Sequence, residues 1–123
     1  SPETRRDALL ALAWAIVPVY SLHQFEEHGW DCLGRRYAFI DYINDLAGLP
    51  MLTPRIITIV NVLVVWLAFP ACTLFAEITG DLTPPTLCWG MCLFNGVVGH
   101  CLPAAFQLKY NPGAVQSATL LVP

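Results

Sequence analysis

Charged side chains are scarce in this sequence of 123 residues, where they make up 12% of the total. Soluble chains carry roughly 25%. Lysine and arginine together number only six, which argues against the basic surface that nucleic-acid binding requires. The formal net charge of −3 is too small to indicate any other partner. The shortage of charge therefore argues against both a soluble domain and a nucleic-acid-binding protein.

Motifs that mark well-known catalytic sites are also missing. The sequence has no glycine-rich phosphate loop, no dinucleotide fingerprint and no Ser/His/Asp order typical of a nucleophilic triad. Its five cysteines are odd in number, include no Cys-x-x-Cys pair and lie mostly inside apolar stretches. Cysteines of this kind are usually small buried side chains, and Cys88 and Cys92, one helical turn apart, are only a weak metal signal on their own.

Apolar residues, in contrast, are abundant. They make up 56% of the chain, and the mean hydropathy is +0.57. A small soluble domain could not bury this much apolar surface, because it hides only part of its chain. A lipid bilayer removes that difficulty, so the composition predicts an integral membrane protein with the bilayer as its main partner.

The apolar residues occur in long runs separated by Gly, Pro and charged residues. The runs predict long helices over residues 7–28, 54–78 and 84–108, and a shorter helix from 113. Roughly 20 residues of helix cross the hydrocarbon core, and lipid offers no partner for open backbone groups. We expect a single all-α domain over residues 1–123, a bundle of about four transmembrane helices. The last run stops at Pro123, so we expect a fragment cut within its fourth helix.

The segment between the first two runs is more polar. Residues 36–47 predict a short amphipathic helix at the membrane interface, followed by the helix-ending residues Gly48 and Pro50. Asp41 and Asp45 should face outward. Apolar residues recur at helical spacing and should face the bundle: Phe39, Ile40 and Ile43. This helix should lie across the mouth of the bundle.

A group of ionisable residues closes the first run, in the stretch His23-Gln24-Phe25-Glu26-Glu27-His28. At about 100° per residue, Glu26 and Glu27 share one helical face with His23, whereas His28 points elsewhere. Two carboxylates and an imidazole on one turn can bind a transition metal. This donor set suits Fe, Mn or Zn better than Mg or Ca.

A simpler explanation is that these side chains end the helix among lipid headgroups, where they reach water at little cost. The expected depth of the polar residues in the bilayer favours a shared site instead. Counted from the start of each predicted span, His23, Asn61 and His100 fall in the same half of the bilayer, and Asn95 lies slightly deeper. An ionisable residue at a helix centre costs roughly 2.5–3.5 kcal/mol. Gathering such residues lets each satisfy the others.

The pattern His23-x-x-Glu26-Glu27 resembles the motif that names the HXXEE-domain family of membrane proteins. That family has two further motifs with counterparts in this sequence. Its Asn-x-x-x-x-His motif corresponds to Asn95 to His100, and its late Pro-Gly pair corresponds to Pro112-Gly113. The order agrees, and the resemblance covers nearly the whole chain. It implies a membrane setting and a shared site, and it supplies no reaction.

The leading hypothesis is a metal-dependent membrane enzyme, a hydrolase or an oxidase, that acts on a lipid-soluble or interfacial substrate. The expected metal ligands are His23, Glu26, Glu27 and His100. Glu26 and Glu27 would also take part in catalysis. Asn61 and Asn95 would orient the ligands or a bound water through hydrogen bonds. The cofactor would be a divalent transition metal that acts as a Lewis acid or an oxidant.

Two other functions remain open on the sequence. Intramembrane His and Glu residues also serve in transporters and in conduits for protons or metal ions. A small chain without an internal repeat makes a transporter less favoured. The polar cluster could instead lock helices together in a structural assembly protein.

Basic residues give a weak indication of orientation. Four lie on the motif side of the membrane and two on the other: Arg35, Arg36, Arg55 and Lys109 against Arg5 and Arg6. Because cytoplasmic loops carry an excess of Lys and Arg, we expect the His/Glu end to face the cytoplasm.

Overall fold

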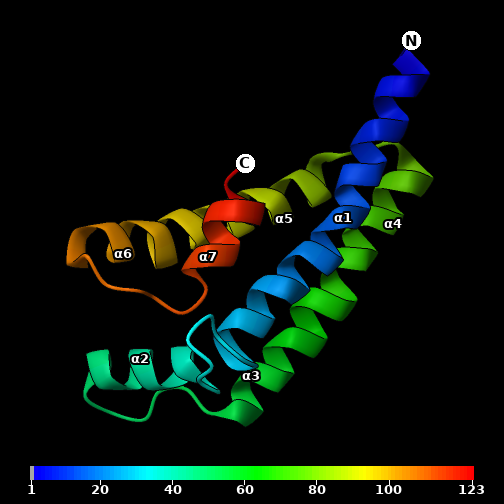
Figure 1. The fold of residues 1–123 in the computed structure, drawn as a ribbon. Coiled ribbons are helices and arrows are strands. Elements are labelled where there is room, and N and C mark those ends of the chain that lie inside the picture. Colours follow the sequence, from blue (N-terminus) through cyan, green and yellow to red (C-terminus); the bar gives the residue numbers. More distant parts are fainter. Residues whose placement is uncertain (1) are drawn as a thin grey trace.

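The computed structural model describes residues 2–123, which fold into helices joined by short loops (Figure 1). The first long helix is α1, Pro2–His28. The second is continuous over three segments: α3 (Pro54–Val60), η1 (Asn61–Ala68) and α4 (Phe69–Thr79). The third is built in the same way: α5 (Thr83–Phe94), η2 (Asn95–Cys101) and α6 (Leu102–Gln107). The shorter helices are α2 (Ala38–Ala47) and the pair α7 (Ala114–Gln116) and η3 (Ser117–Leu121).

The predicted all-α architecture is confirmed, with helix ends close to those expected from the sequence. Within the described residues, three helices are long and apolar enough to cross a membrane: Glu3–His28, Pro54–Thr79 and Thr83–Gln107. At about 1.5 Å per residue, α7 and η3 together extend only about 12 Å. A fourth spanning helix therefore stays a prediction.

Three stretches of π-helix, η1, η2 and η3, interrupt the α-helical hydrogen bonding. A proline lies two residues after the end of each stretch, at Pro70, Pro103 and Pro123. Proline supplies no N–H, and its ring crowds the carbonyl four residues earlier, so the preceding turn must widen or kink. Pro70 and Pro103, which lie inside the following helical segments, therefore account for the position of η1 and η2. Pro123 lies beyond the last helix, and Pro18 leaves α1 regular.

The long helices pack around a small apolar core. In Figure 1 the second helix lies antiparallel to α1 along much of its length, while α5 to α6 diverges from this pair. The buried core cluster contains residues from α1, η1, α4, α5 and η3: Ile16, Val65, Phe69, Cys92 and Leu121. Two hydrogen bonds join the helices nearby, because the Thr73 hydroxyl donates to the Ala13 carbonyl (3.3 Å) and the Trp89 indole to the Leu12 carbonyl (3.0 Å).

Helix α2 lies where the amphipathic segment was predicted, and its faces have the expected polarity. Ile40 is buried and Phe39 and Ile43 are half-buried, whereas Asp41 and Asp45 are exposed. The helix contacts α1. The predicted short helix and the polarity of its faces are confirmed, and its position over the mouth of the bundle stays a prediction.

Gly96 provides a close approach between η2 and η3. A Cβ atom at this position would lie 3.3 Å from the Leu121 Cβ and 3.5 Å from the Ser117 Cβ. At Gly90, in the preceding segment α5, an added Cβ atom would meet nothing within 4 Å. The absence of a side chain at Gly96 therefore lets η3 dock.

We expect Gly96→Leu to lower the free energy of unfolding by about 1–3 kcal/mol, because the added side chain overpacks this contact. Unfolding of the purified protein in detergent micelles measures the change. Gly90→Leu is the matched control and should have a much smaller effect. Equal destabilisation by the two substitutions would show that docking of η3 does not depend on Gly96.

Candidate metal centre

The carboxylate of Glu27 lies among all three histidines of the chain. Its Oε1 atom is 3.1 Å from the Nε2 atom of His23 and 2.7 Å from the Nε2 atom of His100. Its Oε2 atom is 2.9 Å from the Nε2 atom of His28. His23 and Glu27 meet because they lie one helical turn apart in α1, while His100 comes from η2.

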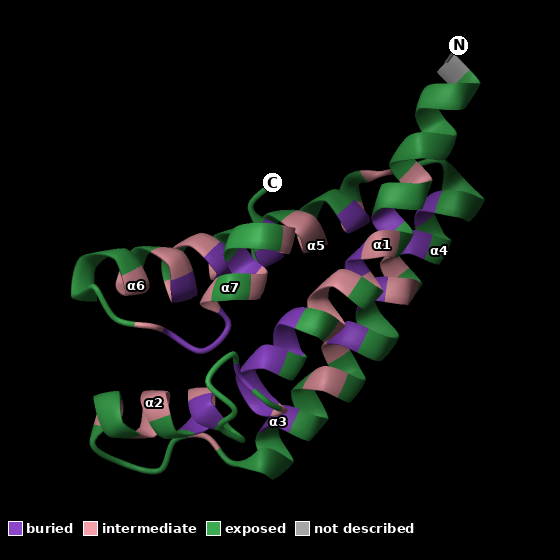
Figure 2. Cartoon of the chain, viewed as in Figure 1, coloured by how far each residue is buried: buried purple, intermediate pink, exposed green. Residues whose placement is uncertain are grey.

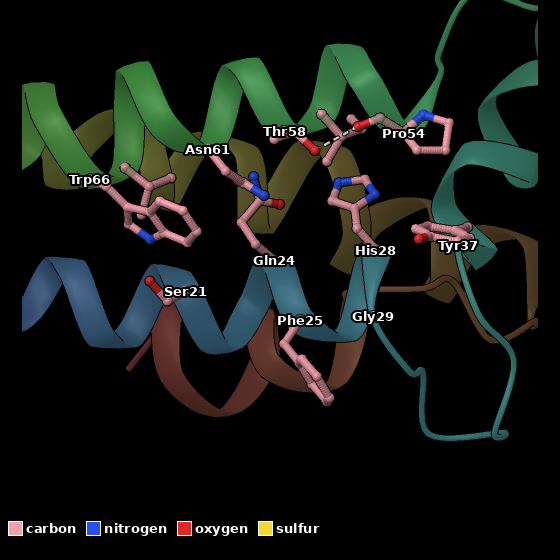
Figure 3. A pocket seen from close by; sticks show the side chains of 12 residues that line it. Ser21, Gln24, Phe25, His28, Gly29, Tyr37, Pro54, Thr58, Asn61 and Trp66 are labelled. Carbon is pink, nitrogen blue, oxygen red and sulfur yellow. Dashed lines mark hydrogen bonds between the residues drawn. The ribbon is translucent and has the colours of Figure 1, made fainter.

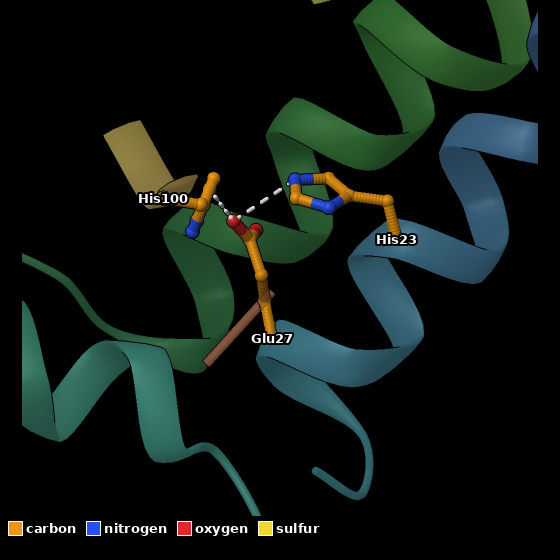
Figure 4. Close-up of side chains that lie close together, drawn as sticks. All are labelled: His23, Glu27 and His100. Carbon is orange, nitrogen blue, oxygen red and sulfur yellow. Dashed lines mark ion pairs between the residues drawn. The ribbon is translucent and has the colours of Figure 1, made fainter. Parts of the chain in front are cut away.

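Three of these residues could hold one metal ion. Ligand atoms of His23, Glu27 and His100 all lie within 4.8 Å of one another, and all three side chains are buried. Figure 4 shows the two imidazole rings converging on the carboxylate. The predicted meeting of His23, Glu27 and His100 is therefore observed, with His100 coming from a different helix than the other two.

Asn111 fixes the protonation of the His100 ring. Its side-chain amide donates through Nδ2 to the carbonyl of Gly99 (3.3 Å), so its Oδ1 atom is the one that faces His100 Nδ1 at 2.9 Å. An amide oxygen only accepts, which places the ring hydrogen on Nδ1. In the neutral ring, Nε2 then carries a lone pair and points at Glu27 Oε1.

Two acceptor atoms 2.7 Å apart repel each other unless a cation or a proton lies between them. His100 Nε2 and Glu27 Oε1 form such a pair. Metal-bound histidines usually donate their second N–H to a carbonyl or carboxylate, as His100 does to Asn111. The arrangement therefore fits a cation site on chemical grounds.

Two further polar groups hold the rings. Ser117 Oγ is 3.2 Å from Nδ1 of His23, and both residues are fully buried. The amide nitrogen of Asn95 is 3.3 Å from His23 Nε2 and 3.4 Å from His100 Nε2, and it donates to the Tyr20 hydroxyl (3.3 Å). The predicted position of Asn95 beside the ligands is thus observed.

A buried loop passes directly over the cluster. Asn111, Pro112 and Gly113 are buried, and Figure 2 shows this stretch in purple before α7. Gly113 has φ +92°, and a Cβ atom there would lie 2.8 Å from the His100 ring and 2.9 Å from the Glu27 side chain. The late Pro-Gly pair of the sequence therefore belongs to the wall of the site.

Phe39 of α2 closes the cluster from another direction. Its ring centroid lies 5.1 Å from that of His100 and 5.7 Å from that of His28. Edge and tilted contacts of this kind bury the rings and exclude water. Helix α2 consequently acts as a cover for the cluster.

Glu26 does not join this group, in contrast to the expectation that it would be a fourth ligand. Its carboxylate accepts hydrogen bonds from the backbone N–H of Gln116 (2.7 Å) and Val115 (3.4 Å), and from the Tyr110 hydroxyl (2.7 Å). Partial burial and the bond to Glu26 raise the pKa of Tyr110, so its hydroxyl stays protonated as a donor. The unsatisfied N–H groups at the start of α7 attract the carboxylate because a helix begins there.

Asn61 also lies apart from the three ligands. It lines a separate cavity between α1 and the second helix, and its Oδ1 atom is buried without a hydrogen-bond partner. Its predicted role in orienting the ligands has no contact to support it in the described residues.

The sequence did not identify His28, Asn111 and Ser117 as parts of the cluster. The helical wheel turns His28 away from His23, but a wheel describes only where the side chain leaves the backbone. Glu27 and His28 each have rotatable side chains, which meet beside the helix. Asn111 could have been found from the Pro112-Gly113 pair that follows it, whereas Ser117 had no distinguishing signal.

Comparison with known protein families gives a match over most of the chain. A family model described as a protein of unknown function with HXXEE motif matches residues 14–123. The match includes the part of α1 that carries the cluster and continues through η3. No curated protein and no solved structure matches the chain.

Gly113→Ala should disrupt the cluster, since the new Cβ meets His100 and Glu27 and the backbone conformation disfavours any L side chain. We expect the free energy of unfolding to fall by at least about 2 kcal/mol. Gly48→Ala is the matched control, because Gly48 also has positive φ (+69°) but open space around it. If both variants lose the same stability in a denaturation series, backbone strain alone explains the effect and the close contact does not matter.

Glu26→Leu should destabilise the docking of α7 without removing a ligand. Charge-assisted hydrogen bonds contribute about 1.5–3 kcal/mol each, so a loss of about 2–3 kcal/mol in unfolding free energy is expected. Glu77→Leu serves as control, because Glu77 is an exposed glutamate that accepts one side-chain bond from Trp14 (2.8 Å). A Glu26→Leu variant as stable as Glu77→Leu would rule out the anchoring role.

Proposed function

This chain belongs to the family of proteins of unknown function with the HXXEE motif, and we propose that it is a metal-dependent membrane enzyme. Its substrate would be lipid-soluble or lie at the membrane interface. The three long apolar helices support a place in the bilayer. The excess of basic residues near the cluster supports an orientation in which the cluster end faces the cytoplasm.

The observation that carries the proposal is the convergence of two buried imidazoles and one carboxylate within 4.8 Å. The same donor set, two histidines and one carboxylate, holds catalytic zinc in hydrolases and iron in non-haem oxygenases. Both kinds of site leave coordination positions open. A divalent Fe, Mn or Zn ion bound here would supply Lewis-acid or redox chemistry.

The residues of the chain would have separate tasks. His23, Glu27 and His100 would hold the ion. Asn111 and Ser117 orient the two rings through the nitrogen atoms that face away from the carboxylate. Phe39 limits the access of water. A catalytic role for Glu27 beyond binding the ion stays a prediction, whereas Glu26 is placed to anchor α7.

We expect the full-length protein purified in detergent to contain a stoichiometric transition metal by elemental analysis. Glu27→Gln keeps the shape of the side chain and removes its charge, so metal content should fall by at least about tenfold. Bound metal should also stabilise the folded protein, by about 2.7 kcal/mol at one hundred times its dissociation constant. That stabilisation should be lost in the variant.

Glu77→Gln is the matched control and should keep both the metal and the stabilisation, because Glu77 is exposed at the far end of α4. Identical metal content in Glu27→Gln and the parent protein would contradict the proposal. So would a parent protein that takes up no Fe, Mn or Zn at saturating concentration.

A proton or ion conduit is the second candidate, favoured by a different observation. A continuous series of close polar contacts leads from Ser117 through His23, Glu27 and His100 to Asn111. Such a series can also move protons inside a membrane. Proton flux through liposomes that hold metal-free protein would favour the conduit. A protein that binds no metal and conducts no protons would indicate that the cluster is a structural lock between helices.

A further inference from the structure

A second cavity lies next to the candidate metal centre, between α1 and the helix formed by α3 and η1 (Figure 3). Its volume is about 280 Å³. His28 lines this cavity with one side of its ring and contacts Glu27 with the other. One imidazole therefore separates the cavity from the carboxylate at the centre of the cluster.

Three buried polar atoms in the described residues have no hydrogen-bond partner, and all belong to residues that line this cavity. They are Oε1 of Gln24, Oδ1 of Asn61 and Nδ1 of His28. Gln24 and His28 are both more than nine-tenths buried, with 8% and 9% exposure. An unpaired buried polar group is costly, so three such atoms around one cavity indicate that a polar ligand enters it.

The chemistry of the three atoms defines the group they can bind. His28 Nε2 faces a carboxylate oxygen at 2.9 Å, which can only accept, so the hydrogen of the neutral ring is on Nε2. Nδ1 of His28 therefore presents a lone pair. Together with the two amide oxygens it forms a set of three acceptors. A hydroxyl group can donate its one hydrogen to one of them and accept from the side-chain NH2 groups of the same amides.

The remaining lining indicates that the ligand is uncharged and has an apolar tail. Among the described residues that line the cavity there is no Asp, Glu, Lys or Arg. Ile57 and Val65 form apolar walls, and the rings of Phe25 and Trp66 are more than half exposed, at 57% and 56%. Figure 3 shows the amides of Gln24 and Asn61 directed toward each other across the cavity.

The size of the cavity sets the part of the ligand that it can enclose. Sites for whole drug-sized ligands occupy roughly 300–1,000 Å³, so this cavity accepts a small head group and the first few methylenes. The rest of an alkyl chain would extend past Phe25 and Trp66 into lipid.

We propose that this cavity binds the head group of a long-chain alcohol. Its hydroxyl would donate its one hydrogen to one of the three acceptor atoms and accept from a side-chain NH2 group of Gln24 or Asn61. The cavity would also define the substrate class of the enzyme, which rests on the proposed function. Binding of the alcohol itself requires no metal.

Photolabelling of the full-length protein in detergent tests this directly. The probes are 1-hexadecanol with a diazirine in its chain and the O-methyl ether of the same molecule. The ether keeps the chain and removes the hydroxyl donor. We expect the alcohol to label the segments that carry Phe25 and Trp66 about tenfold more than the ether, since a tenfold difference in binding corresponds to about one hydrogen bond.

Asn61→Leu and Gln24→Leu should each reduce labelling by the alcohol about tenfold and leave labelling by the ether unchanged. Neither residue is among the three candidate ligands, so metal content should stay as in the parent protein. Gln107→Leu makes the same chemical change at an exposed position outside the cavity and should have no effect. Asn61→Leu should also keep or raise stability, because it removes an unpaired buried oxygen.

Equal labelling by the alcohol and the ether would overturn the inference, and this comparison needs no variant. Labelling outside the cavity would overturn it too. Alcohol-selective labelling of a protein without metal would support the cavity and reject the proposed enzyme. A metal-loaded protein that does not distinguish the two probes would reject the cavity and leave the metal centre in place.

Discussion

The interaction on which the structure depends is the pairing of one buried carboxylate with three imidazoles. Glu27 is 4% exposed, and an isolated charge at such depth would be costly. The N–H of His28 at 2.9 Å, and a cation or proton held between the carboxylate and the rings of His23 and His100 at 3.1 and 2.7 Å, compensate that cost. Because His100 belongs to a different helix, the same contacts hold η2 against α1. Chemistry and packing therefore depend on the same atoms.

The backbone around this pairing is adapted to it in two ways. The loop before α7 passes so close to His100 and Glu27 that only a glycine fits at position 113. The π turns η2 and η3 each contribute a residue that contacts the histidines, Asn95 and Ser117. Widened turns of this kind occur often at functional sites. For η2, Pro103 two residues further along explains where the turn forms.

Much of this arrangement could be predicted from sequence patterns. Apolar runs bounded by Gly and Pro predicted the long helices within a few residues, since helix ends follow local chemistry. Depth along each span correctly brought His100 to His23 and Glu27. The same argument wrongly grouped Asn61 with them, because depth does not determine which side of a helix faces which neighbour. The roles of Asn111 and Ser117 depended on the path of a loop, which no periodic pattern encodes.

The two adjacent glutamates of the motif, Glu26 and Glu27, have different structural roles. Glu27 follows His23 by one helical turn and shares its face, so the pair meets the same partner helix. Glu26 leaves α1 about 100° away and reaches the first N–H groups of α7. By fixing α7, Glu26 holds the loop with Asn111 and Gly113 over the cluster, and Ser117 beside His23. The second carboxylate thus supports the site from outside, by positioning the segment that orients both rings.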